Sequence, residues 1–154
     1  MFTFNIYAGT MWLLRGLAWN HLRGGKVQNI PLILIVEDDV LIQTLVEEAL
    51  QEGGFETAIA PSAEEAVTLI KGRVRNYRAL VTDINLKGRM TGWEVARHAR
   101  QIVPEFPIVY MTGAAARDWT SQGVPNSILL VKPFVPAQLV TAVSQLLIVG
   151  TPNG

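Results

Sequence analysis

The chain of 154 residues contains no cysteine. A disulfide framework, a zinc site built on thiolates and a cysteine nucleophile are therefore all excluded. Charged residues are also scarce, at 17% of the chain against roughly 25% in an average soluble domain. The 13 basic residues balance the 13 acidic ones, so the chain lacks the basic surface that wraps nucleic acid, and we expect no nucleic-acid partner. The 49% hydrophobic content excludes wholesale disorder.

The first thirty residues differ in composition from the rest. They contain three basic residues and no acidic residue, and their apolar side chains gather within residues 2–19. Arg15 interrupts the apolar stretch and Arg23 and Lys26 follow it, whereas a secretory signal has its basic residues before the apolar stretch. The charge-free stretch at residues 1–14 is shorter than the ~20 residues that span a membrane. We expect residues 1–30 to be an N-terminal extension, either poorly ordered or a peripheral helix, on a cytoplasmic protein without a membrane span.

From residue 31 onward, short aliphatic runs alternate with amphipathic segments. The unbroken aliphatic run at residues 32–36 is typical of a strand covered on both faces. Further strands are predicted at residues 55–60, where the pattern is weaker, and at 79–83, 107–111 and 128–131. Helices are predicted between and after them, at residues 40–50, 62–71, 91–101, 115–122 and 136–148. Parallel strands need crossover connections, so the alternation predicts one α/β domain over residues 31–149, followed by a short tail at 150–154. Its predicted architecture is a doubly wound, five-stranded parallel sheet with helices on both faces.

Polar residues stand where four of these strands end. Glu37 and Asp38 follow the first strand, Asp83 closes the third, Thr112 follows the fourth and Lys132 follows the fifth. Ligands of open α/β sheets bind outside the carboxyl ends of the strands, so we expect these side chains to converge. Three carboxylates would repel one another and would favour a divalent cation, of which Mg²⁺ suits all-oxygen ligands. The lysine and the hydroxyl would give charge and hydrogen bonds to a phosphoryl group on the central carboxylate.

Four motifs at these strand ends resemble those of the receiver domain of two-component response regulators. They read Leu-Ile-Val-Glu-Asp-Asp at 34–39, Val-Thr-Asp-Ile-Asn-Leu at 81–86, Tyr-Met-Thr-Gly at 110–113 and Val-Lys-Pro-Phe at 131–134. Each motif alone is weak, but all four in this order at successive strand ends are specific. The resemblance runs from residue 33 to about residue 147 and implies the flavodoxin-like strand order 2-1-3-4-5.

The resemblance also implies a role for each residue of the site. The residues implied to carry the phosphorylation chemistry are the phosphoacceptor Asp83 together with Thr112 and Lys132. The ligands implied for Mg²⁺ are Glu37, Asp38, Asp83 and the backbone carbonyl of Asn85. The bond between Lys132 and Pro133 would be the cis peptide of the family, which only an X-Pro bond forms at small cost.

The function implied by the resemblance is that of a phosphoacceptor in a two-component phosphorelay, not that of an enzyme. A histidine kinase or a histidine phosphotransfer protein would place a phosphoryl group on Asp83. The signal would then pass to an unknown downstream protein by binding, or onward by phosphoryl transfer. Only about six residues follow the last predicted helix, which predicts a stand-alone receiver.

Two other functions stay open. A degenerate receiver would act as a docking module independent of phosphorylation, although the presence of every expected site residue argues against this. A phosphatase with an aspartate nucleophile would also use a strand-end carboxylate, Mg²⁺, a threonine and a lysine. Such enzymes resemble one another in having an aspartate two residues after the nucleophile, where this sequence has Asn85, which cannot transfer a proton.

The sequence departs from the family pattern in two places. The loop between Asp83 and Gly92 is one residue longer than usual and lacks the usual proline, so we expect it to be more mobile. The switch aromatic of the family lies three residues before the lysine, where this sequence has Leu129. Leucine cannot provide the rotating ring, so the signal is predicted to travel through residues 113–116, which follow Thr112.

Overall fold

The computed structural model describes residues 29–149, so the extension predicted for residues 1–30 lies almost entirely outside the described part, as does the tail. The elements in chain order are β1 (Leu32–Val36), α2 (Val40–Glu52), β2 (Glu56–Ala60), α3 (Ala63–Gly72), β3 (Tyr77–Asp83), α4 (Gly92–Ile102), β4 (Ile108–Thr112), η1 (Ala116–Asp118), α5 (Trp119–Gln122), β5 (Ile128–Val131) and α6 (Pro136–Val149). None of the helices among these residues is long and apolar enough to cross a membrane.

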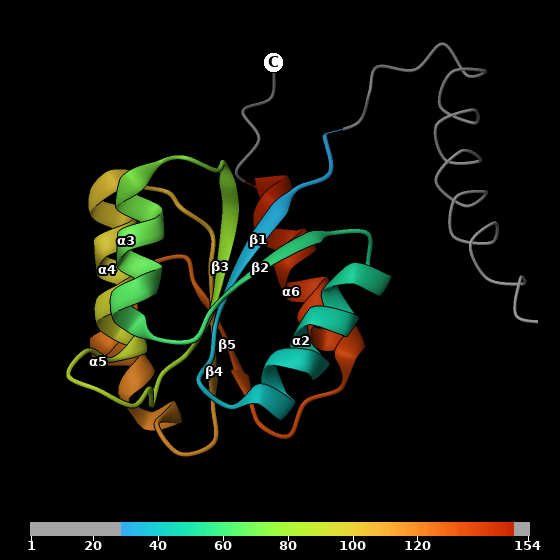
Figure 1. Ribbon diagram of the computed structural model, residues 1–154. Coiled ribbons are helices and arrows are strands. Elements are labelled where there is room, and N and C mark those ends of the chain that lie inside the picture. The colour runs from blue at the N-terminus through green and yellow to red at the C-terminus, as the bar shows by residue number, and fades with distance from the viewer. Residues whose placement is uncertain (1–28, 150–154) are drawn as a thin grey trace, which may run out of the picture.

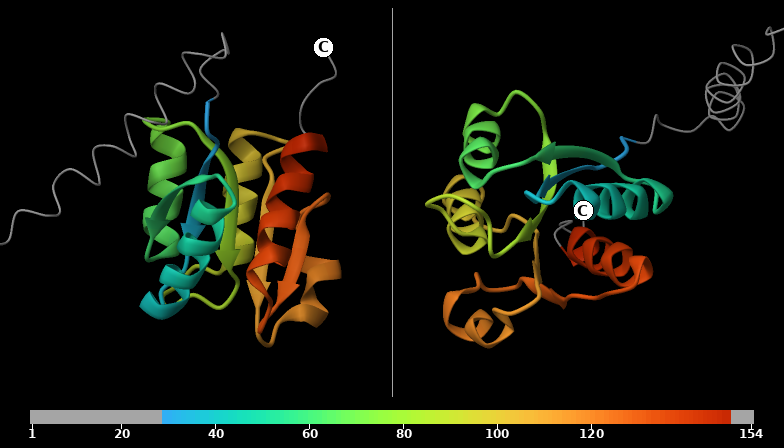
Figure 2. Two further views of the ribbon diagram at one scale, coloured as in Figure 1. Left: turned by 90° about the vertical axis from the view of Figure 1, so that its right-hand side faces the viewer. Right: turned by 60° about the horizontal axis from the view of Figure 1, so that its bottom comes forward.

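The five strands form one parallel sheet in the order β2-β1-β3-β4-β5. Helices α3, α4 and α5 cover one face, and α2 and α6 cover the other (Figure 1). The two further views show the same three layers from other sides (Figure 2). The predicted fold class, the strand order and the helices on both faces are therefore confirmed. The winding reverses beside β1, so the carboxyl ends of β1 and β3 lie at the position where such sheets bind ligands.

Burial on both faces explains the unbroken aliphatic runs. Every residue of β1 and β4 is buried, because side chains that alternate along each strand enter two separate cores. The core beneath α3 and α4 includes Leu34, Val36, Leu80 and Tyr110. The core beneath α2 and α6 includes Ile33, Ile35, Val81 and Met111. Among the strands in residues 29–149, only β5, at one edge of the sheet, has no buried residue.

Helix caps determine where the chain turns away from the strand ends. The side chain of Asp39 accepts hydrogen bonds from the amides of Leu41 and Ile42, so α2 starts directly after Glu37 and Asp38. Thr91 and Glu94 form a reciprocal capping box at the start of α4. Both caps lie at the carboxyl edge of the sheet, and they give the loops next to it defined paths.

Most predicted boundaries hold to within one or two residues, and two differences have a clear structural reason. Strand β3 begins at Tyr77, two residues before the predicted start, because Tyr77 pairs with Leu32 of β1. The helix predicted for residues 115–122 is a 3-10 turn followed by a single helical turn, η1 and α5. Neither piece contains a buried residue, so this segment has no apolar face to hold a longer helix against the sheet.

Gly92, the first residue of α4, lies against the end of β3. Its amide donates a 2.9 Å hydrogen bond to the carbonyl of Ile84. A Cβ atom at Gly92 would lie 2.0 Å from the carbonyl oxygen of Asp83 and 2.8 Å from the Cα atom of Ile84. Because both obstacles are backbone atoms, no side-chain rotation can relieve the overlap. The absence of a side chain at Gly92 therefore lets α4 approach the strand that carries Asp83.

Replacing this glycine tests the close approach. Gly92→Ala should lower the free energy of unfolding by about 1–3 kcal/mol or more, measured by chemical denaturation, since the added methyl group must displace backbone. Gly72→Ala is the matched control, because the nearest atom to its Cβ would be 3.9 Å away. The control should change stability by less than about 1 kcal/mol. Equal effects of the two substitutions would contradict the packing argument.

Candidate functional site

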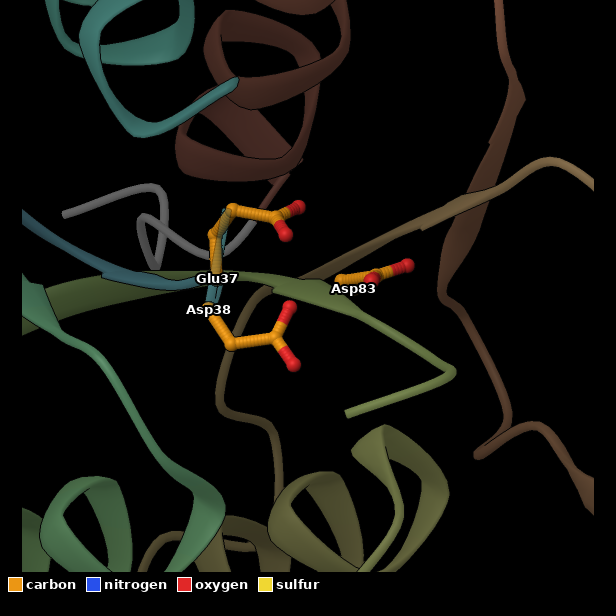
Figure 3. A group of neighbouring side chains, drawn as sticks. All are labelled: Glu37, Asp38 and Asp83. Atoms are coloured by element: carbon orange, nitrogen blue, oxygen red, sulfur yellow. The ribbon is translucent and has the colours of Figure 1, made fainter. Parts of the chain in front are cut away.

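Three carboxylates meet at the carboxyl edge of the sheet. Glu37 and Asp38 follow β1 and Asp83 ends β3, and one ligand oxygen from each lies within 4.8 Å of the other two. Glu37 and Asp38 leave the chain in opposite directions, and both turn their carboxylates to the side on which Asp83 lies (Figure 3). Glu37 is only 1% exposed and Asp83 only 6%. The convergence predicted for these three residues is confirmed.

Lys132 places its charge between the two buried carboxylates. Its Nζ atom lies 3.3 Å from Oε2 of Glu37 and 3.4 Å from Oδ1 of Asp83. The Lys132 side chain remains 24% exposed, so its ammonium group contacts both the site and solvent. The peptide bond between Lys132 and Pro133 is cis, as predicted. Glu37, Asp83 and Lys132 thus meet at the carboxyl ends of β1, β3 and β5.

Hydrogen bonds hold the carboxylates in position. The Asp39 amide donates to Oε1 of Glu37 at 3.1 Å. The Lys87 amide, in the loop between β3 and α4, donates to Oδ2 of Asp38 at 2.8 Å. Sequence reasoning missed this contact from Lys87. No sequence signal could have found it, because any non-proline residue has the donor and only the path of the loop brings it to Asp38.

The carboxyl groups differ in their electrostatic environment. Burial raises the pKa of Glu37 and of Asp83 above their ordinary values, and the nearby Lys132 ammonium offsets only part of this effect. Burial also raises the pKa of Asp38, but the hydrogen bond from the Lys87 amide and other hydrogen bonds outweigh it, so the net pKa is lowered. When all three carboxyls are ionised, Lys132 alone cannot balance them, and the oxygen-rich cluster favours a further cation.

Thr112 ends β4, the strand next to Asp83, and is fully buried. Its hydroxyl oxygen accepts hydrogen bonds from the amides of Ala114 at 3.2 Å and Ala115 at 2.8 Å. The Thr112 carbonyl accepts a 2.7 Å hydrogen bond from the Lys132 amide. Thr112 therefore connects the site to the loop that leads into η1. Asn85 is exposed two residues after Asp83, and its role as a carbonyl ligand remains a prediction.

The doubly wound parallel sheet thus carries an acidic cluster at the carboxyl edge where its winding reverses. Residues 33–144 match the family model of the response regulator receiver domain. The chain therefore belongs to the response regulator receiver family, and the predicted family is confirmed.

Curated relatives support the same conclusion. The transcriptional regulatory protein PrrA of Mycobacterium tuberculosis is 32% identical over 119 residues, which are 76% of this chain and 50% of PrrA. The response regulator receiver protein CpdR of Brucella abortus is 30% identical over 118 residues, which are 75% of this chain and 96% of CpdR. The chain thus spans about half the length of the matched transcriptional regulators but nearly all of CpdR.

Solved structures share the fold. A response regulator receiver protein from Sinorhizobium medicae is 42% identical, with a TM-score of 0.76 over 78% of this chain and 96% of that one. The chemotaxis protein CheY4 of Vibrio cholerae is 26% identical, with a TM-score of 0.69 over 77% of this chain and 99% of that one.

The raised pKa of Asp83 predicts a pH-dependent stability. A carboxyl whose pKa is raised by folding binds its proton more tightly in the folded state, so ionisation destabilises the fold as pH rises. In metal-free buffer, Asp83→Asn should therefore raise the free energy of unfolding at neutral pH. The gain should vanish at pH values below the unfolded pKa of about 3.9, where the wild-type carboxyl is neutral in both states.

Urea denaturation of both proteins across a pH series checks this expectation. Asp39→Asn is the matched control, because asparagine caps a helix about as well as aspartate and Asp39 lies outside the cluster. A gain for Asp83→Asn that persists unchanged at the acid end would show that it does not come from ionisation.

Proposed function

We propose that the protein is a cytoplasmic receiver that accepts a phosphoryl group on Asp83 from a histidine kinase or a histidine phosphotransfer protein. The observation that carries this proposal is the position of the Asp83 carboxylate, buried at the end of β3 with one oxygen 3.4 Å from the Lys132 ammonium. Family membership supports the same role.

The reaction is an in-line transfer between two nucleophiles. An oxygen of the ionised Asp83 carboxylate attacks the phosphorus, the new O–P bond forms, and the N–P bond of the phosphohistidine breaks. The departing imidazole nitrogen keeps the electron pair of the broken bond. Lys132, already in contact with the Asp83 carboxylate, neutralises negative charge that gathers on the phosphoryl oxygens.

The acidic cluster fits Mg²⁺ as the cofactor of this transfer. Glu37, Asp38 and Asp83 offer oxygen atoms close together, and Mg²⁺ prefers one or two carboxylates with additional oxygens from water or phosphate. The backbone carbonyl of Asn85 is the further ligand that we propose. When bound, Mg²⁺ supplies positive charge between the carboxylates and the phosphoryl oxygens.

A surface beside the site suits a protein donor. An apolar groove of about 310 Å³ adjoins Lys132, between α2 and the segment that follows β5. Side chains that line it include Ile42, Leu45, Val46, Phe134 and Leu139. Leu41 and Leu45 are exposed, so the groove continues into an apolar surface on α2. Such surfaces mark protein contacts, and this one lies where a donor must present its phosphohistidine to Asp83.

Thr112 would report the modification to a partner. A phosphoryl group on Asp83 offers new oxygen acceptors at the neighbouring strand end. The Thr112 hydroxyl, which now accepts hydrogen bonds from Ala114 and Ala115, would turn to donate to a phosphoryl oxygen and release both amides. The loop after β4 would then change conformation, and the signal would pass to an unidentified protein by binding, or onward by phosphoryl transfer.

The acceptor assignment is tested with a small phosphodonor. Incubation with acetyl phosphate and Mg²⁺ should add one phosphoryl group by intact mass, and hydroxylamine should remove it because acyl phosphates react with this nucleophile. Asp83→Asn should abolish the adduct. Asp39→Asn is the matched control and should retain it, since Asp39 caps α2. An adduct that persists in Asp83→Asn would move the acceptor elsewhere.

The metal assignment is tested separately by titration. Asp38→Asn should weaken Mg²⁺ binding by roughly tenfold or more, because an anionic ligand is lost. Removing charge from Glu37 together with Asp38 should weaken it further. Isothermal calorimetry of these proteins measures the change, with Asp39→Asn expected to bind like the wild type. Unchanged affinity in the double variant would place the metal elsewhere.

A further inference from the structure

Tyr110 occupies a position in β4 that connects it to Thr112. The two residues are two apart in the strand, so their side chains lie on the same face of the sheet. Tyr110 is fully buried and pairs across the strands with Leu129, the residue at the position of the family's switch aromatic. Its ring lies against Trp93 of α4, with 4.6 Å between the ring centroids. An aromatic ring is thus present beside Leu129, but it belongs to β4 and is enclosed.

The Tyr110 hydroxyl reaches the loop between α5 and β5. It accepts a 3.1 Å hydrogen bond from the amide of Val124. Burial raises the pKa of Tyr110, so the hydroxyl stays protonated at neutral pH. A rigid, buried side chain thereby connects the strand that carries Thr112 to this distant loop.

Two arginines of α4 hold the last residue of α5 and the loop that follows it. Arg97 donates a 3.2 Å hydrogen bond to the backbone carbonyl of Gln122 and a second one to the Gln122 side chain. Arg100 donates to the carbonyl of Asn126 at 3.5 Å and to that of Phe106 at 2.7 Å. We call residues 122–127, which comprise the last residue of α5 and the loop up to β5, the anchor loop.

The anchor loop also binds α5 directly. The indole N–H of Trp119 donates to the hydroxyl oxygen of Ser127 at 3.1 Å, and the Ser127 hydroxyl donates to the carbonyl of Val124 at 2.6 Å. A Cβ atom at Gly123 would lie 2.4 Å from Cδ1 of Trp119, so the indole packs closely on the loop backbone.

The segment between β4 and the anchor loop is therefore held differently at its two ends. Its near end depends on the Thr112 hydroxyl, which accepts from Ala114 and Ala115 and which the proposed phosphorylation would draw away. Its far end is held by side chains that lie outside the acidic cluster. With small residues at 113–116, the near end also offers little steric resistance to displacement.

We propose that Tyr110 is a positioning residue for the response to phosphorylation: its hydroxyl fixes the anchor loop, so that release by Thr112 moves residues 113–118 about a stationary far end. The proposal rests on the proposed function, because the release requires a phosphoryl group on Asp83. In this proposal Tyr110, a fixed aromatic residue on β4, lies beside Leu129. The surface that changes on phosphorylation is then confined to the loop after β4 and to η1.

The first test needs no phosphorylation. Tyr110→Phe removes only the hydroxyl, so hydrogen exchange of the Val124 amide should become roughly three- to tenfold faster, the usual net value of one hydrogen bond. Tyr77→Phe is the matched control, a buried tyrosine in β3. It should leave exchange at Val124 unchanged. Unaltered Val124 exchange in Tyr110→Phe would overturn the proposed role of the hydroxyl.

The second test uses acetyl phosphate and Mg²⁺, with amide NMR signals and intact mass recorded on the same samples. In the wild type, the amides of Ala114 and Ala115 should shift, while the Val124 amide and the Trp119 indole signal stay in place. In Tyr110→Phe, with the same adduct by mass, the Val124 and Trp119 signals should shift as well. A wild-type Val124 shift as large as that of Ala115 would overturn the stationary anchor.

A second variant guards against indirect effects of a change in the core. Arg97→Ala alters an exposed side chain and removes both hydrogen bonds to Gln122, so it should also spread the phosphorylation shifts into the anchor loop. Shifts confined to the near end in both variants would overturn the proposal. If the wild type gains no phosphoryl group, the proposed function is refuted instead. The hydrogen-exchange measurement would still test whether the Tyr110 hydroxyl protects the Val124 amide.

Discussion

The crowding of three carboxylates around a single ammonium is the interaction on which the rest of the site depends. Glu37 and Asp83 are buried, so each loses hydration when it ionises, and Lys132 lies within 3.4 Å of both. Asp38 adds a third negative charge that this lysine does not contact directly. The site therefore has an excess of negative charge in a partly buried position, which would favour the cation binding and the reaction with phosphorus that we propose.

The parallel sheet makes this crowding possible. Strand β1 lies between β2 and β3, and the buried faces of β1, β3 and β4 provide the packing that offsets the cost of gathering like charges. The approach of Gly92 to the end of β3 and the Asp39 cap of α2 belong to the same arrangement. They turn the chain sharply at the carboxyl edge, so that the three carboxylates stay together there.

The segment between β4 and the anchor loop is held by different contacts at its two ends, and the proposed response to phosphorylation depends on this difference. Thr112 retains the start of the segment through its hydroxyl, at the strand end next to Asp83, the proposed acceptor. Tyr110 and the arginines of α4 retain its end through contacts remote from the acidic cluster. A local change of charge at Asp83 can thus be converted into movement of one end, because a segment fixed at both ends by equally remote contacts would not respond.

The sequence by itself determined the alternation of strands and helices, the fold class and the convergence of Glu37, Asp38 and Asp83 with Lys132. These features follow from hydrophobic periodicity and from strand ends, which are local properties of the chain. Only the tertiary structure decided that β3 starts at Tyr77, that the segment before β5 forms a single helical turn, and that the amide of Lys87 holds Asp38. It also decided that Tyr110 reaches Val124. The short helix reflects the lack of buried residues in its segment. The other three features each depend on a backbone group that meets a distant part of the chain, and nearly every residue carries such groups, so residue identity alone could not reveal them.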